Sequence, residues 1–186
     1  MSDEGATVGS AAGVDESEER GVGEGRGDGG SPAAPGADRV SVAADRLGLA
    51  VEVVERPAAE SLEEAAALLG LDASSVVKSL VVKRHDGTFL FALVPGDRQI
   101  SWSKLRSVVG VNKLSMPSAE VAFEATGYER GTITPLGSST AWPVFADERI
   151  LGLRVALGAG VHGRSALVDA DALVAGLSAT VADISD

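Results

Sequence analysis

The sequence predicts an α/β domain in which helices surround a mixed, mostly antiparallel sheet. Two expected strands, 76–83 and 88–94, flank a favoured hairpin turn at Asp86-Gly87. Segments with helical spacing lie on both sides of this pair, and the later strands are separated by hairpin-like spacings rather than by strand–helix–strand crossovers. The length of 186 residues suits one ordinary domain.

The individual elements follow from local patterns. Apolar residues recur at helical spacing over 38–47, which predicts a first helix. Ser61 and Glu64 form a capping box that opens a second helix, and Gly70 ends it. The segment 88–94 is apolar on both faces and is therefore expected in the middle of a covered sheet. The remaining expected elements are strands at 51–54, 142–146, 150–157, 164–168 and 180–184, and helices at 103–109, 118–125 and 169–177.

Acidic charge is concentrated at the N-terminal end. Residues 1–38 hold nine acidic and two basic residues, a net charge of −7, which leaves −4 of the chain's −11 for residues 39–186. The same segment holds ten of the 23 glycines and few large apolar side chains, so it cannot bury enough apolar surface to offset its ordering entropy. We therefore expect a disordered, acidic, glycine-rich tail over 1–38 and one folded domain over 39–186.

Several protein classes are excluded by composition and motif content. Without cysteine, disulfide frameworks, thiol catalysis and Cys-ligated zinc are excluded. No apolar run reaches the roughly 18 residues of a membrane span, and the acidic N-terminus lacks a signal-peptide pattern, so we expect a cytoplasmic protein. The chain has two histidines, no H-E-x-x-H or H-x-E pair and no G-x-S-x-G elbow. An enzyme with this sequence is expected to work without a metal, a cofactor or a covalent nucleophile.

Lys78, on the first strand of the hairpin, is the leading candidate for chemistry. Alternation places it on one face with Val76, Leu80 and Val82, where an ammonium group is unfavourable unless it finds a partner or a cleft. A lysine that lines a pocket can bind an anion or a carbonyl group, or ionise abnormally. The alternative is an edge position from which the long side chain reaches solvent. The spacing alone does not decide between the two.

Two glycine-rich segments could place backbone amides beside a ligand. Gly127, Gly131 and Gly137 punctuate an irregular loop, although this pattern is also common in plain connectors. Residues 158–163 fit G-x-G-x-x-G after an expected strand, but too few residues follow for a dinucleotide-binding half-domain. A tight turn that brings His162 toward a cleft remains, against the alternative of a surface histidine in a hairpin turn.

Seven segments occur in a distinctive order. They are SLEEAA at 61–66, VVKSL at 76–80, LVPGD at 93–97, TGY at 126–128, GTITPLG at 131–137, AD at 146–147 and GAG at 158–160. In this order and spacing, over nearly all of residues 39–186, the sequence resembles the YbaK/ProX family of prolyl-tRNA-synthetase-associated aminoacyl-tRNA deacylases. The resemblance implies a compact α/β domain with a partly barrel-like sheet. It also implies an editing function, the hydrolysis of the ester between a wrong amino acid and its tRNA.

The resemblance also implies roles for individual residues. Lys78 matches the family's pocket lysine and Gly131 opens the loop at the aminoacyl ester, so both are expected at the catalytic centre. Backbone amides near Gly131 could stabilise an oxyanion, and Lys78 could anchor the terminal adenosine or polarise the ester. The tRNA's own 2′-hydroxyl or the substrate's side chain could then assist the attack. Substrate contacts are expected from Ser79, Thr132, Ile133, Thr134, Pro135, Asp147, Gly158, Gly160 and His162.

Two departures from the family pattern and the charge distribution bear on the substrate. Ser79 stands where threonine is usual and Thr132 where a second glycine is frequent, which affects the choice of amino acid more than the class of activity.

The expected partner is the acceptor end of an aminoacyl-tRNA, contacted by a basic rim of Lys104, Arg106, Lys113 and Arg130. A synthetase partner is left open, and neither membrane nor DNA is expected. The alternatives are a non-catalytic module that binds aminoacyl-tRNA or a small ligand, and an interaction domain recruited through the acidic tail.

Overall fold

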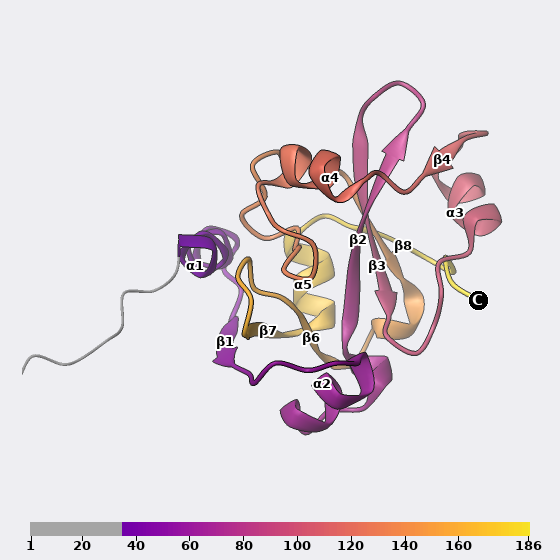
Figure 1. Ribbon diagram of the computed structural model, residues 1–186. Helices are drawn as coiled ribbons and strands as arrows, with labels where there is room; N and C mark the ends of the chain where they lie inside the picture. Colours follow the sequence, from indigo (N-terminus) through magenta and orange to yellow (C-terminus); the bar gives the residue numbers. More distant parts are fainter. Residues whose placement is uncertain (1–34) are drawn as a thin grey trace, which may run out of the picture. The chain divides into compact units, whose positions relative to one another are not determined.

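The computed structural model describes residues 35–186, which contain five α-helices and eight β-strands (Figure 1). Residues 1–34 of the acidic tail expected over 1–38 lie outside the described part of the chain. The last four residues of that expected tail, Pro35–Asp38, instead form the first turn of α1. In chain order the elements are α1 (Pro35–Leu47), β1 (Glu52–Glu55), α2 (Leu62–Leu69), β2 (Val77–Arg84), β3 (Phe89–Pro95), α3 (Trp102–Val109), β4 (Leu114–Ser115), α4 (Ala119–Thr126), β5 (Val144–Asp147), β6 (Arg154–Gly158), β7 (Arg164–Asp169), α5 (Ala170–Gly176) and β8 (Thr180–Ala182).

The strands form two sheets, with strand orders β1-β7-β6 and β4-β2-β3-β5-β8. The pairs β3–β5 and β5–β8 are parallel, and the other pairs are antiparallel. Within the described residues, one parallel bridge, between Val76 and Ala156, links the sheets. The predicted α/β fold with a mixed, mostly antiparallel sheet and surrounding helices is therefore confirmed, but the strands of the described residues do not close into a barrel.

Strand β3 lies at the centre of the larger sheet, as its apolar sequence predicts, and all but its first residue is buried. Phe91 and Leu93 face the main core, together with α1, α5 and the smaller sheet. Leu90, Ala92 and Val94 face a second cluster that is closed by α3 and the C-terminal segment. Figure 1 shows this arrangement, with the β2–β3 hairpin running through the middle of the domain.

Helix caps explain where the helices around the site begin and end. The Ser61 hydroxyl accepts a hydrogen bond from the Glu64 N–H, as predicted, whereas the Glu64 carboxylate accepts from the Glu60 N–H, one residue earlier than in the standard capping box. Ser118 caps α4 in the same way, by accepting from the Val121 N–H. Gly70, Gly110 and Gly127 end α2, α3 and α4 in the left-handed conformation.

Several boundaries differ from the predicted ones near the C-terminal end. The strand predicted over 150–157 is β6, which begins only at Arg154 because Glu148–Ile150 forms a 3-10 turn. That turn is capped by Asp147, whose carboxylate accepts from the Arg149 N–H. The short strand β4 was not predicted, since two residues carry no readable alternation.

Among residues 35–186, none of the helices combines the length and the apolar character that crossing a membrane requires.

A network of charged side chains fixes the C-terminal segment to the large sheet. Asp183 receives a 2.8 Å contact from Arg149 and a 3.2 Å contact from Lys104, and Lys104 also contacts Asp186 at 2.8 Å. Arg149 further contacts the fully buried Asp147 carboxylate at 3.2 Å. Asp147 also accepts from the Ile184 N–H, so its carboxylate joins the end of β5 to the last residues of the chain.

Replacing Asp183 with asparagine is expected to lower the thermal midpoint at neutral pH. The hydrogen bond from Arg149, aided by Lys104, lowers the pKa of Asp183 from 3.8 to about 2. Because the folded protein holds Asp183 ionised more strongly than the unfolded chain does, the carboxylate stabilises the fold at any pH above the ordinary pKa of 3.8. This contribution is lost as the pH falls from 3.8 towards 2. Thermal melts followed by circular dichroism should therefore show a difference between the two proteins at neutral pH that shrinks over this range. A difference independent of pH would contradict this assignment.

Candidate functional site

A cavity of about 740 Å³ runs along an open edge of β2. β2 pairs with β3 over nearly its whole length but with β4 only at Lys83 and Arg84, so among the described residues no strand covers the edge from 77 to 82. Residues from both faces of β2 consequently line the cavity. Its other walls come from the start of α2, the start of α4, the loop after α4 and the turn between β6 and β7.

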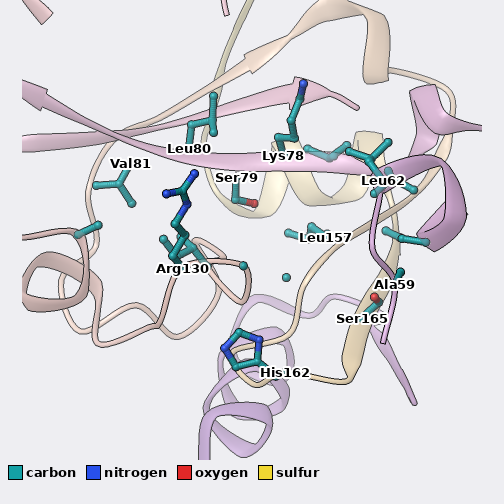
Figure 2. Close-up of a pocket in the computed structure, with 18 of the residues that line it drawn as sticks. Ala59, Leu62, Lys78, Ser79, Leu80, Val81, Arg130, Leu157, His162 and Ser165 are labelled. Carbon is teal, nitrogen blue, oxygen red and sulfur yellow. The ribbon is translucent and has the colours of Figure 1, made fainter. Parts of the chain in front are cut away.

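Side chains on β2 divide between the two sides of this edge. Ser79 and Val81 point towards the part of the cavity bounded by Leu157 and His162, whereas Lys78 points to the opposite side (Figure 2). The Ser79 hydroxyl is buried and makes no hydrogen bond within the described residues. The alternation predicted from the sequence is thus correct, but the cavity takes residues from both faces because it follows an edge.

Lys78 is half-buried at the cavity wall. Its ammonium group donates a hydrogen bond to the main-chain carbonyl of Arg98. Burial lowers the pKa of Lys78 below its ordinary value, and the carboxylates of Asp97 and Glu63 offset part of this shift. Lys78 therefore lines a cavity, which is the first of the two sequence-based alternatives, and it does so from an open strand edge with its ammonium group held by a carbonyl.

The loop 131–137 is held against the end of β6 by two glycines. A Cβ atom on Gly158 would collide with the carbonyl oxygens of Thr132 and Ile133, so only glycine allows the loop backbone to pack there. The Gly160 N–H donates to the Thr132 carbonyl at 2.9 Å. These contacts explain why glycines of the 158–160 turn accompany the loop in the sequence pattern.

Arg39 of α1 fastens both ends of the segment 126–137. Its guanidinium donates to the carbonyls of Thr126, Gly127 and Gly137 at 2.5–3.2 Å. It also lies over the ring of Tyr128, 4.3 Å from the ring centroid. The buried Tyr128 hydroxyl in turn donates to the Leu136 carbonyl at 2.8 Å, so the loop is closed across its base.

An Arg39→Ala variant is expected to loosen this loop without unfolding the domain. Three carbonyls would lose their donor, and the free energy of unfolding should fall by about 1–3 kcal/mol. If the loop forms the reaction site, kcat should fall more than KM rises, because the loop would be misplaced rather than absent. Chemical denaturation and steady-state kinetics measure the two effects. An Arg39→Lys variant, which keeps the charge but not the three-carbonyl geometry, should recover little, and full recovery in that variant would contradict this role.

His162 and Gly131 meet at the mouth of the cavity. The His162 Nε2 lies 3.0 Å from a carboxylate oxygen of Glu129, and both side chains are largely exposed. Gly131 has a φ of +90°, and a Cβ atom there would approach the imidazole of His162 to 3.6 Å. Within the described residues, the Gly131 N–H makes no hydrogen bond, whereas the Thr132 N–H donates to the Glu129 carbonyl. Gly131 therefore offers an available amide donor beside an open cavity.

The cavity is basic although the chain is acidic. Arg56, Lys78, Arg130 and Arg164 line it together with His162, and no Asp or Glu is among its lining residues. Of the basic rim predicted from the sequence, only Arg130 lies at the cavity. Lys104 is bound to acidic residues at the C-terminal segment instead. Within residues 35–186, no cluster of three His, Asp or Glu side chains could hold a metal ion.

The structure brings together about half of the predicted site residues. Lys78, Ser79, Gly131, Ile133, Gly158 and His162 line the cavity. The others do not line it: Thr132, Thr134 and Pro135 are buried within the loop, Gly160 supports the loop from below, and Asp147 is occupied by Arg149 and Ile184. Arg56, Arg164 and Ser165 were not predicted, because β1 and β7 place them at the cavity only after the strands have paired.

Comparison with known proteins identifies the family to which the chain belongs. The family profile "Aminoacyl-tRNA editing domain" matches residues 56–175. The chain belongs to the aminoacyl-tRNA editing domain family. This match, together with the relatives described below, confirms the predicted resemblance to prolyl-tRNA-synthetase-associated editing proteins. The match begins after α1, so Arg39 lies outside the matched residues, whereas the loop that it contacts lies within them.

Relatives of this editing domain include parts of larger enzymes and a protein of similar size. The chain is 39% identical over 88 residues to the proline–tRNA ligase of Thermosipho africanus, and 36% identical over 104 residues to that of Geobacter sulfurreducens. The matches cover 47% and 56% of this chain but only 16% and 18% of those enzymes. A solved structure titled as a candidate trans-editing enzyme for prolyl-tRNA synthetase superposes with a TM-score of 0.76 and 31% identity, over 82% of this chain and 98% of that one.

Proposed function

We propose that this editing domain is a trans-acting deacylase, which hydrolyses the ester bond of a mischarged aminoacyl-tRNA. The observation that carries the proposal is the cavity along β2, which combines a basic lining without carboxylates with an available amide at Gly131. A nucleic acid end is an anion, so its binding requires such a local excess of positive charge. The similarity in size and fold to the candidate trans-editing enzyme supports action as a separate chain.

The reaction requires a nucleophile and stabilisation of negative charge on the ester carbonyl oxygen. The Gly131 N–H is the proposed oxyanion donor, because it is not used within the described part of the protein. Lys78 is proposed to bind the terminal nucleoside or polarise the ester after leaving the Arg98 carbonyl. The attacking water is proposed to be activated by the substrate's own hydroxyl groups.

The apolar part of the cavity supports a small amino acid as the group removed. Small and medium side chains line it, among them Ala65, Val77, Ala122, Ala156 and Leu157. A pocket of this kind admits a small wrong amino acid more readily than a larger cognate one, which is the logic of a second editing sieve. Because the relatives are proline–tRNA ligases, tRNA-Pro carrying alanine, cysteine or serine is the proposed substrate set.

A deacylation panel tests the proposal. Purified full-length protein is mixed with tRNA-Pro charged separately with alanine, cysteine and serine, and the remaining ester is followed over time. At least one substrate should lose its amino acid faster than in buffer. If none does, and a wider panel of mischarged tRNAs is equally stable, the deacylase proposal is wrong. Tight binding of the charged tRNA without turnover would instead identify a non-catalytic binding module.

A further inference from the structure

We propose that the Ser79 hydroxyl binds the side chain of the amino acid to be removed, so that the cavity prefers serine over an apolar amino acid of the same size. This inference rests on the proposed function, since it assumes that the cavity receives an aminoacyl ester. It gives a chemical class to a substrate that the size of the cavity alone leaves open. The observation behind it is a buried polar atom that lines the cavity without a partner.

Ser79 interrupts an otherwise apolar face of β2. Val77 and Val81, two positions before and after it, are 4% and 2% exposed and belong to the main core. Alternation places Ser79 on the same face, and its side chain points towards the part of the cavity bounded by Leu157 and His162 (Figure 2). A hydroxyl among aliphatic side chains is unfavourable unless it forms a hydrogen bond. A ligand that supplies this bond is therefore stabilised at Ser79.

The other serine hydroxyls of the cavity already have partners within the described residues. Ser61 and Ser118 accept hydrogen bonds from main-chain N–H groups at the starts of α2 and α4, at 3.1 and 3.3 Å. Ser165 accepts from the Arg56 Nε at 3.3 Å. Threonine, tyrosine, asparagine and glutamine are absent from the residues that line the cavity. Among these lining residues, Ser79 thus offers the one neutral side-chain polar group that is not already hydrogen-bonded.

The chemistry of this position favours a hydroxyl group on the substrate. A serine hydroxyl both donates and accepts, and it turns between three staggered positions, so it can meet another hydroxyl in either role without movement of the strand. The substrate's α-ammonium group is less suitable, because one neutral acceptor beside apolar side chains does not offset the desolvation of a charge. A thiol is a weaker donor and acceptor. We therefore expect serine to be removed faster than cysteine, and alanine to be removed without help from Ser79.

The kinetic test compares tRNA-Pro charged with serine, with 2-aminobutyrate and with alanine. In 2-aminobutyrate a methyl group replaces the serine hydroxyl at nearly the same size, so this pair isolates the hydrogen bond. After subtraction of the buffer rates, the wild-type protein should show a kcat/KM roughly tenfold higher for the seryl ester than for the 2-aminobutyryl ester, the effect of one buried neutral hydrogen bond. Ser79→Ala should bring this ratio close to one, by slowing the seryl ester alone.

Ser165→Ala is the matched control, because it also removes a hydroxyl from the cavity wall, but one that Arg56 already engages. This variant should keep the roughly tenfold preference for the seryl ester. Loss of the preference in Ser165→Ala to the same extent as in Ser79→Ala would contradict a specific contact at Ser79.

A binding measurement separates this inference from the proposed function. The probes are adenosines that carry serine or 2-aminobutyrate through a 3′-amide, which replaces the labile ester, and calorimetry should show roughly tenfold tighter binding of the serine probe to the wild type alone. Such a preference without deacylation of any charged tRNA would keep the Ser79 contact and remove the deacylase. Deacylation of all three esters without a preference for serine, or with one that survives in Ser79→Ala, would overturn the contact and leave the proposed function standing. Equal slowing of all three esters in Ser79→Ala would also overturn it, since the hydroxyl would then act on a group that the substrates share.

Discussion

A Lys78→Ala variant should lose at least about a hundredfold in kcat/KM for deacylation, which is the usual cost of removing one electrostatic donor from a reaction site. Lys78 is the one ammonium group on the cavity wall within the described residues, and burial already lowers its pKa. The thermal midpoint should change little, because the ammonium group contributes a single hydrogen bond, to a main-chain carbonyl. Steady-state deacylation kinetics and thermal melts measure the two quantities.

Lys83→Ala is the matched control for this variant. Lys83 lies on the same strand but is exposed and does not line the cavity, so its loss should leave deacylation unchanged. The pH dependence provides a second test. If the ammonium form of Lys78 is required, activity should begin to fall at a lower pH than the ordinary lysine value of 10.5 would predict. Deacylation by Lys78→Ala at the wild-type rate would remove Lys78 from the reaction.

A Gly158→Ala variant is expected to lose both activity and stability. The added methyl group would collide with the backbone carbonyls of Thr132 and Ile133, so the loop that carries Gly131 must move. Overpacking of this kind costs about 1–3 kcal/mol of unfolding free energy. A displacement of about 1 Å at the reaction site can itself reduce the rate roughly a hundredfold. Urea denaturation and deacylation kinetics on the same preparation separate the two losses.

The control for Gly158 is a glycine that is costly to replace but remote from the loop. Gly152 has a φ of +72° and open space around its missing side chain, so alanine there strains the backbone without touching 131–137. Gly152→Ala should lose about 1 kcal/mol of stability and keep its activity. Equal activity losses in both variants would show that destabilisation, and not loop displacement, explains the effect at Gly158.

Local sequence patterns predicted most of the fold. The hairpin of β2 and β3, the Ser61 cap and the glycines that end α2, α3 and α4 depend on contacts between residues close in the chain, so short-range rules suffice for them. The burial of β3 on both faces followed from its unbroken apolar run. The split into two sheets was not predictable, because it depends on which distant strands pair, such as β1 with β7.

The site was predicted less completely than the fold. Lys78, Gly131 and Gly158 could be found because they fall in segments with a recognisable order. Arg56 and Arg164 are far apart in the sequence, and they line the same cavity only once β1 has paired with β7. Asp147 was predicted as a substrate contact by position, yet its buried carboxylate already caps a turn and binds Arg149 and Ile184.

The most direct measurement is the rate at which alanine is released from Ala-tRNA-Pro by the purified chain, with no synthetase present and with Pro-tRNA-Pro beside it. A trans-acting editing cavity predicts release from Ala-tRNA-Pro at least roughly tenfold above the buffer rate, with the cognate ester spared and the effect lost in Lys78→Ala. Equal, buffer-like rates for Ala-tRNA-Pro and for the other mischarged tRNAs would contradict this function.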